Sequence, residues 1–133
     1  MTVFDPLRRK EVELTPEEEV RQEIINALHS KMKIPFSLMA SEYAFKYNGL
    51  LYRSDIVVFD RILKPLMLVE CKAPSVKLKE KVIDQVIRYN FVLNVKYIMI
   101  SNGKTTYLCR KGEKSGKYGP VDTIPSYEEM INK

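Results

Sequence analysis

The spacing of hydrophobic residues divides the chain into two amphipathic helices and five short strands. Apolar residues recur at helical spacing from Thr15 to about Met32 and again from roughly Lys79 to Leu93. Between and after these segments, apolar runs of strand length are bounded by turn residues. The expected strands cover residues 38–47, 50–59, 66–71, 96–100 and 105–109. The pattern therefore predicts the order α-β-β-β-α-β-β.

Local signals at the ends of these elements indicate how they connect. Thr15 is placed as an N-cap before Pro16, with Glu18 three residues after the cap, which is typical of a helix start. Asn48-Gly49 and Asn102-Gly103 are two-residue hairpin signals. A helix between the third and fourth strands allows a parallel crossover, while the hairpins give antiparallel neighbours. We predict an α/β domain with a mixed sheet and helices packed on it.

The composition indicates one domain. With 133 residues and 45% hydrophobic content, the chain can form a single core. We expect a loose lead-in over residues 1–14, a core over 15–110, and a basic mobile loop with a C-terminal tail over 111–133. No apolar run reaches membrane-spanning length. Cys71 and Cys109 both fall in predicted strands, so we expect no disulfide framework and a reducing, cytoplasmic location.

The charge distribution favours a polyanionic partner. The net charge is +5 and the pI is about 9.1. Basic clusters that flank an acidic pocket suit a nucleic-acid backbone approaching a bound metal. For either cluster alone, a solvated lysine-rich surface is the more common explanation. The two clusters are Lys77, Lys79 and Lys81, and Lys104, Arg110, Lys111, Lys114 and Lys117.

Three charged residues interrupt the apolar strands and are the main candidates for chemistry. Asp55 lies inside the second predicted strand, and Glu70 and Lys72 lie at the end of the third. Because strand side chains alternate, Glu70 and Lys72 project to one side. If the two strands are neighbours, Asp55 comes close to Glu70. Burying such charges costs several kcal/mol unless they are paired or hold a metal.

This set fits metal-assisted hydrolysis of a phosphodiester. Mg²⁺ prefers carboxylate and carbonyl oxygens, so Asp55, Glu70 and the main-chain carbonyl of Cys71 are the predicted ligands, with Mn²⁺ as a substitute. The ion would polarise the scissile phosphate and activate a water molecule. Lys72 would orient that water or offset the charge that develops on the phosphate.

The motifs resemble those of the PD-(D/E)XK nucleases, with Ser54 in place of the proline. Within that superfamily, the chain resembles the nuclease domain at the N-terminus of type I restriction enzyme R subunits over residues 15–110. Five blocks carry the resemblance: Glu17-Glu18-Glu19-Val20-Arg21-Gln22, Arg53-x-Asp55-Ile56-Val57-Val58, Val69-Glu70-Cys71-Lys72-Ala73-Pro74, Gln85-x-x-x-Tyr89-Asn90 and Ser101-Asn102-Gly103.

The resemblance implies a restriction-endonuclease-like core and Mg²⁺-dependent DNA cleavage, with Lys72 as the catalytic lysine. It also implies roles for Gln85 and Tyr89, which lie four residues apart on one helix face. A sheet-facing helix explains that spacing equally well. Arg53 is expected to hold Asp55 or to touch a phosphate. Further nucleic-acid contacts are predicted at Lys77, Lys79, Lys114 and Lys117.

An acidic residue of the first helix often lies near the metal in this superfamily. Glu18 is the favoured candidate and Glu17 its rival, although Glu18 also fits a capping box with Thr15. Glu42 could face Asp55 across the Asn48-Gly49 hairpin, or could simply be an edge charge.

Two other functions remain open from the sequence. The chain could be a non-catalytic nucleic-acid-binding or scaffolding module with a nuclease fold, although its three key residues are intact. It could also act on RNA or branched DNA. R subunits carry ATP-driven translocase domains, and the chain shows no ATP-binding motif. The expected partners are therefore DNA, a second copy in a homodimer, and a translocase or specificity subunit in trans, with no membrane.

Overall fold

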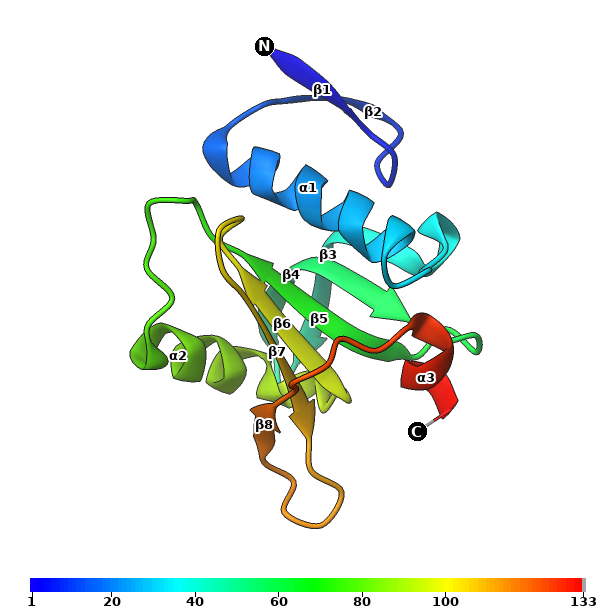
Figure 1. Cartoon of the computed structure of the whole chain (residues 1–133), viewed down its shortest axis with the longest axis vertical. Coiled ribbons are helices and arrows are strands. Elements are labelled where there is room, and N and C mark those ends of the chain that lie inside the picture. Colours follow the sequence, from blue (N-terminus) through cyan, green and yellow to red (C-terminus); the bar gives the residue numbers. More distant parts are fainter. Residues whose placement is uncertain (133) are drawn as a thin grey trace.

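A mixed β-sheet forms the centre of the computed structural model, which describes residues 1–132 (Figure 1). Within that range, the sheet has six strands, and each is hydrogen-bonded to the next in chain order. They are β3 (Met39–Tyr47), β4 (Leu50–Phe59), β5 (Pro65–Cys71), β6 (Tyr97–Ser101), β7 (Thr106–Lys111) and β8 (Tyr118–Pro120). Only β5 and β6 are parallel, and every other neighbouring pair is antiparallel. The predicted mixed sheet is thus confirmed.

Two helices cover opposite faces of this sheet. Helix α1 (Pro16–Ser30) packs on one face, where Met67, Val69 and Cys71 point into a cluster that includes Ile25. Helix α2 (Glu80–Asn90) packs on the other face, where Leu68, Val57 and Ile98 meet Val86. This separation follows from the alternation of side chains along each buried strand. Helix α2 also makes the predicted parallel crossover between β5 and β6.

The helix start that the sequence predicted at Thr15 is also found. Thr15 caps α1, because its Oγ1 accepts a hydrogen bond of 3.1 Å from the backbone N–H of Glu18. Ser126 and Glu129 bond each other reciprocally before α3 (Tyr127–Asn132). Helix α2 is shorter than expected, since a 3₁₀ turn (Phe91–Leu93) follows it. Another 3₁₀ turn (Phe36–Leu38) precedes β3. No helix in residues 1–132 is long and apolar enough to cross a membrane.

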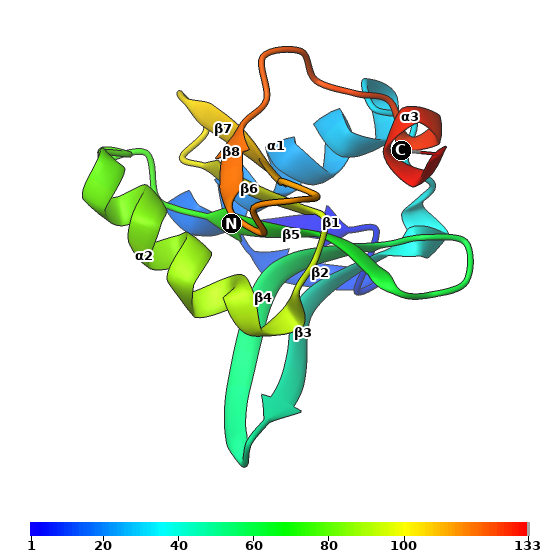
Figure 2. The ribbon, with the colours of Figure 1, turned by 90° about the horizontal axis from the view of Figure 1, so that it is seen from below.

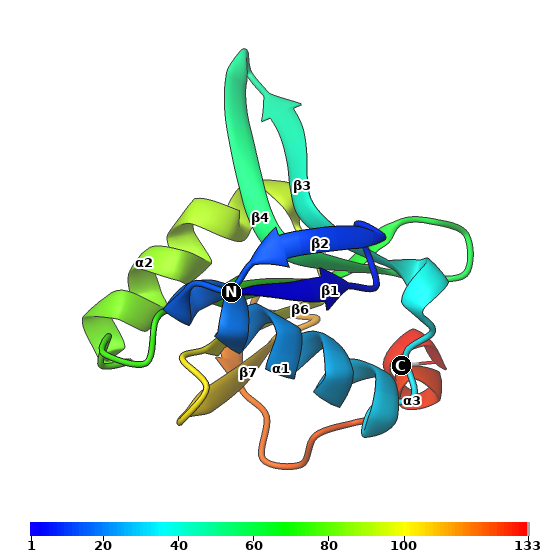
Figure 3. The same cartoon turned by 90° about the horizontal axis from the view of Figure 1, so that it is seen from above.

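Two segments differ from what the sequence predicted. The segment expected as a loose lead-in forms an antiparallel hairpin of β1 (Thr2–Asp5) and β2 (Lys10–Glu13), which packs beside α1 (Figures 1 and 3). Residues 111–119 were expected to be a mobile loop, which is wrong in part because β8 begins at Tyr118 and pairs with β7. Both strands are short, so they carry little periodicity that a sequence pattern can detect.

The β3–β4 hairpin reaches well beyond the rest of the sheet. Figures 2 and 3 show it projecting away from the layers formed by the sheet and helices. Its turn is the predicted Asn48-Gly49 pair, and both residues have positive φ angles of 50° and 77°. Such a turn matches the twist of the two strands. The base of the hairpin carries Asp55 and therefore belongs to the candidate site.

Candidate active site

A cleft of about 340 Å³ lies between the C-terminal end of β5 and helix α2. Five of the predicted site residues line it together, from three different elements: Arg53 from β4, Glu70 from β5, Lys72 just after it, and Gln85 and Tyr89 from α2. The remaining lining residues are Val82, Val86 and Asn90. The structure therefore brings the predicted catalytic lysine, one metal-ligand candidate and the Gln-x-x-x-Tyr element to one opening.

Asp55 lies next to this cleft and is paired with the end of β5. The register Ile56↔Val69 makes Asp55 and Glu70 neighbours across the two strands. Asp55 Oδ2 accepts a hydrogen bond of 2.7 Å from the backbone N–H of Cys71. In a strand, the N–H and C=O of one residue point to the same side. The Cys71 carbonyl therefore lies on the side of β5 that faces β4.

The carboxyl group of Asp55 is close enough to that of Glu70 to affect the pKa of Glu70. Burial raises the pKa of Glu70 from its ordinary value of 4.5 to about 8, and the charge of Asp55 adds to the rise although Lys72 opposes it. Two carboxylates that share a site cannot both ionise freely without a counter-charge. A cation between Asp55 and Glu70 would supply that charge.

The residues present fit a hard divalent cation that keeps several of its water molecules. Among residues 1–132, no three His, Cys, Asp or Glu side chains form a ready metal-binding group. Mg²⁺ is commonly held by only one or two carboxylates, together with waters and substrate phosphate oxygens. Asp55, Glu70 and the Cys71 carbonyl match that pattern better than a closed zinc site, which needs four protein ligands.

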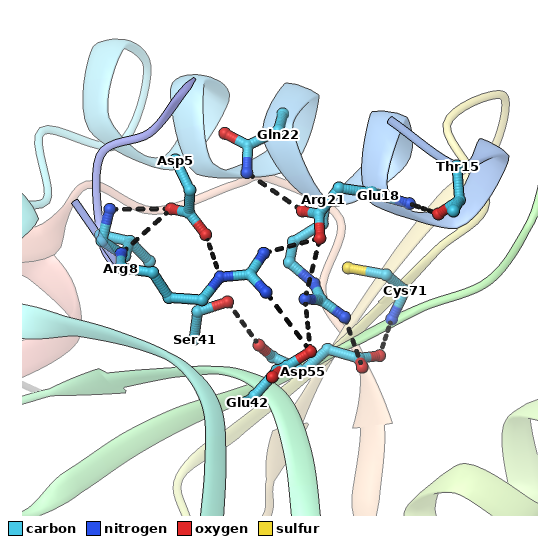
Figure 4. Close-up of polar contacts among 11 residues, drawn as sticks. Asp5, Arg8, Thr15, Glu18, Arg21, Gln22, Ser41, Glu42, Asp55 and Cys71 are labelled. Atoms are coloured by element: carbon cyan, nitrogen blue, oxygen red, sulfur yellow. Dashed lines mark hydrogen bonds and ion pairs between the residues drawn. The ribbon is translucent and has the colours of Figure 1, made fainter. Parts of the chain in front are cut away.

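The N-terminal half of α1 contributes a buried network of charges that ends on Asp55 (Figure 4). Arg21 lies at its centre, with Nη2 at 3.4 Å from Asp55 Oδ1. Its Nη1 lies 3.2 Å from Glu42 Oε1 and 3.3 Å from Glu18 Oε1. Arg21 is buried, and these carboxylates raise its pKa although burial acts in the opposite direction. Arg21 and the Cys71 N–H thus hold the two oxygens of Asp55 in a fixed orientation.

Arg8 continues this network into the β1–β2 hairpin. It bonds Asp5, which is fully buried, and it lies 2.6 Å from Glu18 Oε1 and 3.4 Å from Glu42 Oε1. The N–H groups of Leu7 and Arg8 also bond Asp5. Burial opposes ionisation of Asp5, but the bond from Arg8 and these N–H groups lower its pKa overall. The hairpin is therefore tied to the same carboxylates that surround Arg21.

The acidic residues of α1 and β3 have different surroundings. Glu18 is bound by Arg8, Arg21 and Gln22, whose Nε2 lies 3.0 Å from Glu18 Oε2, so its carboxylate is already engaged. Glu17 is exposed, and its charge makes a minor contribution to the raised pKa of Glu70. Glu17 and Glu18 therefore differ in how free their carboxylates are, and both stay candidates for the acidic residue that assists a metal.

Glu42 lies opposite Asp55, as its place across the hairpin suggested. The flanking pairs are Ser41↔Ile56 and Tyr43↔Ser54. Glu42 has a φ of 52°, which is uncommon for a residue with a side chain and distorts the strand at this point. Both Glu42 and Asp55 reach the same guanidinium group of Arg21. The backbone distortion at Glu42 therefore lies within the candidate site, beside Asp55.

The predicted lysines separate into two groups. Lys79 caps α2 without a side-chain hydrogen bond, and with Gln85 and Arg88 it lines the outer side of that helix, with exposed Lys77 just before it. Lys114 and Lys117 lie in the β7–β8 loop. That loop starts where Lys111 bonds Lys96 at the beginning of β6, whereas Glu70 pairs near the end of β6. Lys114 and Lys117 are therefore at the opposite end of the sheet from the cleft.

Residues 16–125 match the family model of the type I restriction enzyme R protein N terminus. The chain belongs to this family. The match covers every element from α1 to β8, and so includes the cleft and the Arg21 network. It begins after the β1–β2 hairpin, so Asp5 and Arg8 lie outside the matched segment. No curated protein matches the chain.

Solved structures share the fold of this R-protein N-terminal domain. A candidate HsdR subunit fragment of a type I restriction enzyme from Vibrio vulnificus YJ016 is 19% identical, with a TM-score of 0.61. The alignment covers 90% of the chain and 25% of that structure, so the chain spans a quarter of its length. A candidate nuclease of the DUF820 class from Anabaena variabilis ATCC 29413 is 11% identical, with a TM-score of 0.52 and coverage of 98% and 89%.

Sequence reasoning missed Arg21, Arg8 and Asp5 as parts of the site. Arg21 falls inside the first block that carries the family resemblance, one helical turn after Glu18, and that position was the available signal. Asp5 and Arg8 carry no motif, and they reach the network only because the hairpin folds back beside α1.

Replacing Arg8 by methionine is expected to destabilise this R-protein domain by about 2 kcal/mol, because buried Asp5 and Glu18 lose a charged partner. Denaturant unfolding at neutral pH measures the effect. Arg9→Met is the matched control, since Arg9 is an exposed neighbour with the same charge. Equal stability changes in the two variants would contradict a structural role of the Arg8 network.

Proposed function

We propose that the chain is a metal-dependent endonuclease that hydrolyses phosphodiester bonds in DNA. The observation that carries the proposal is the pairing of Asp55 with Glu70 at the edge of a cleft that also holds Lys72. Membership of the R-protein N-terminal family supports a nuclease-like function. Arg53 and the lysines before and along α2 give the cleft a basic border that suits a phosphate backbone.

Each group of the cleft has a role in this proposal. Asp55, Glu70 and the Cys71 carbonyl would hold Mg²⁺, or Mn²⁺ in its place. The bound ion would polarise the scissile phosphate and lower the pKa of the attacking water. Lys72 contacts that water or the developing negative charge, because it lies in the cleft beside Glu70. Arg53 and Gln85 position the phosphate backbone from the two walls of the cleft.

The proposed partners also rest on membership of the R-protein N-terminal family. The chain spans a quarter of the Vibrio vulnificus structure, so the activities of a complete R subunit are not carried over to it. We propose that it works in a type I restriction system, with DNA as substrate and a translocase or specificity subunit supplied in trans. Self-association as a homodimer is part of the same proposal.

A cleavage assay tests the nuclease function. Supercoiled plasmid and single-stranded DNA are incubated with the full chain in Mg²⁺, in Mn²⁺ and in EDTA. We expect nicking that requires metal and is lost in Glu70→Ala, while Glu80→Ala, which removes an exposed carboxylate on α2, cuts normally. A protein that binds DNA but cuts neither substrate with either metal would instead be a non-catalytic binding module.

A further inference from the structure

A row of three aromatic side chains leads out of the cleft onto the β3–β4 hairpin. The ring centroids of Tyr89 and Tyr52 are 5.2 Å apart, and those of Tyr52 and Phe45 are 5.4 Å apart with nearly parallel rings. Tyr89 belongs to α2 and lines the cleft, whereas Phe45 and Tyr52 are cross-strand partners in the hairpin. The aromatic row, Phe45–Tyr52–Tyr89, is therefore continuous with the site.

The base of the hairpin is attached to the core by residues outside this row. Tyr43 and Phe59 already attach the base of the hairpin to the core between the sheet and α2, with their ring centroids 5.5 Å apart. The three rings of the aromatic row belong to neither core cluster. Tyr89 is 45% exposed, and the rings of Phe45 and Tyr52 are half-buried. Tyr89 on α2 and two rings of the β3–β4 hairpin, which projects from the domain (Figure 2), are thus partly open to solvent.

The surroundings of the aromatic row suit a polyanion with flat, apolar groups. Residues 43–54 contain no Asp or Glu, and their two charged residues, Lys46 and Arg53, are both basic and exposed. The backbone N–H of Arg53 donates to the hydroxyl of Tyr89 at 3.3 Å, which holds the hairpin against α2. Phosphates can therefore meet basic side chains while adjacent bases meet the rings.

We propose that the aromatic row binds the unpaired bases of a DNA strand whose backbone lies in the cleft. The inference rests on the proposed function, because the cleft positions the strand. Bases in a duplex are stacked on one another and cannot cover protein rings, so the preferred ligand is single-stranded or locally unpaired DNA. Stacking on aromatic side chains tolerates any base, and the site is therefore expected to show little sequence preference.

Binding measurements without metal test the inference, because no cleavage then occurs. Fluorescence anisotropy in EDTA gives the Kd of the full chain for a labelled dT strand, for an abasic strand of equal length and for a duplex. Wild type is expected to bind dT most tightly. Tyr52→Leu should weaken dT binding roughly tenfold and leave abasic binding unchanged. Tyr52→Phe keeps the ring and should keep the affinity.

Tyr107→Leu is the matched control, since Tyr107 is an exposed tyrosine on β7 outside the aromatic row. It should change the dT affinity by less than about twofold, because it removes no stacking partner. The inference is overturned if Tyr107→Leu and Tyr52→Leu weaken dT binding equally. It is also overturned if wild type binds the abasic strand or the duplex as tightly as dT, a comparison that needs no variant and does not depend on folding of Tyr52→Leu.

The two proposals can fail separately. Metal-dependent cleavage without a difference between dT and abasic binding would reject base binding by the aromatic row and leave the nuclease function in place. The opposite result is also possible: wild type binds dT more tightly than the abasic strand, Tyr52→Leu loses this preference, and no cleavage occurs in Mg²⁺ or Mn²⁺. That result would support base binding by the aromatic row and reject the nuclease function.

Discussion

Replacing Lys72 by alanine is expected to slow DNA cleavage by about 10²–10⁴-fold while leaving Mg²⁺ binding in the absence of DNA nearly unchanged at a pH of about 9, where protonation of Glu70 interferes least. The reason is its position: Lys72 lines the cleft beside Glu70, and its backbone N–H is fixed by a 2.8 Å bond to the carbonyl of Ser101. Its positive charge acts on Glu70, whose pKa it lowers, although Lys72 is not a predicted metal ligand. Initial rates of plasmid nicking and calorimetric titration with Mg²⁺ measure the two effects.

A pH series separates two causes of that loss. Lys72 opposes the rise in the pKa of Glu70, so its removal also favours protonation of that carboxyl group. If protonation alone slows the variant, raising the pH to about 9 should restore cleavage. We expect the loss to persist. Lys31→Ala removes an exposed lysine at the other end of α1 and should cut normally. Normal cleavage by Lys72→Ala would contradict the proposed role.

Local pattern was sufficient to predict the centre of the site. Asp55 and Glu70 stand out because a charge inside a buried strand is costly, and the antiparallel pairing of β4 and β5 follows from the short turn between them. Gln85 and Tyr89 are four residues apart on a helix, so they reach one cleft together. Alternation and helical spacing can be seen directly in a sequence, whereas the roles of Gln85 and Tyr89 were implied by the family resemblance.

The charge network around Asp55 depends on contacts that no local pattern encodes. Arg21 is 34 residues from Asp55 in sequence, and Arg8 meets Glu18 only after the β1–β2 hairpin folds back. The capping role of Thr15 is local and was predicted, but it left open that Glu18 turns its carboxylate to two arginines. Sequence reasoning favoured Glu18 for the metal without indicating that its carboxylate is engaged by Arg8 and Arg21.

The direction of the strands explains why the predicted DNA contacts Lys114 and Lys117 do not lie beside the cleft. The predicted site lies where β5 ends, at the pair Cys71↔Ser101. Strand β7 runs antiparallel to β6, so it starts beside the site at Thr106 and carries the chain away from it. Lys114 and Lys117 follow the far end of β7 and cannot flank the cleft on the same chain. Contact between these lysines and DNA would need a strand long enough to extend along the whole sheet.

Replacing Glu70 by glutamine is expected to stabilise the metal-free protein at pH 8.5 and to have little effect at pH 5. In the wild type, the pKa of Glu70 is raised from 4.5 to about 8, first by burial and then by Asp55. Below the lower value, both the folded and unfolded states keep the proton. Between the two values only the unfolded state releases it, so folding stability falls as the pH rises and reaches its minimum above pH 8. Glutamine does not titrate and avoids this loss.

Thermal unfolding in EDTA measures the difference in Tm between wild type and Glu70→Gln at both pH values. We expect the variant to melt roughly 5–10 °C higher at pH 8.5, since a shift of several pKa units corresponds to a few kcal/mol. Glu80→Gln makes the same chemical change at an exposed position and should give a difference that does not depend on pH. Mg²⁺ added at pH 8.5 should raise the Tm of wild type more than that of Glu70→Gln, because only the wild type offers two carboxylates to the ion. An equal Tm difference at pH 5 and pH 8.5 would mean that Glu70 is not held beside Asp55 as a strained acidic pair, and the cation site proposed between them would lose its main support.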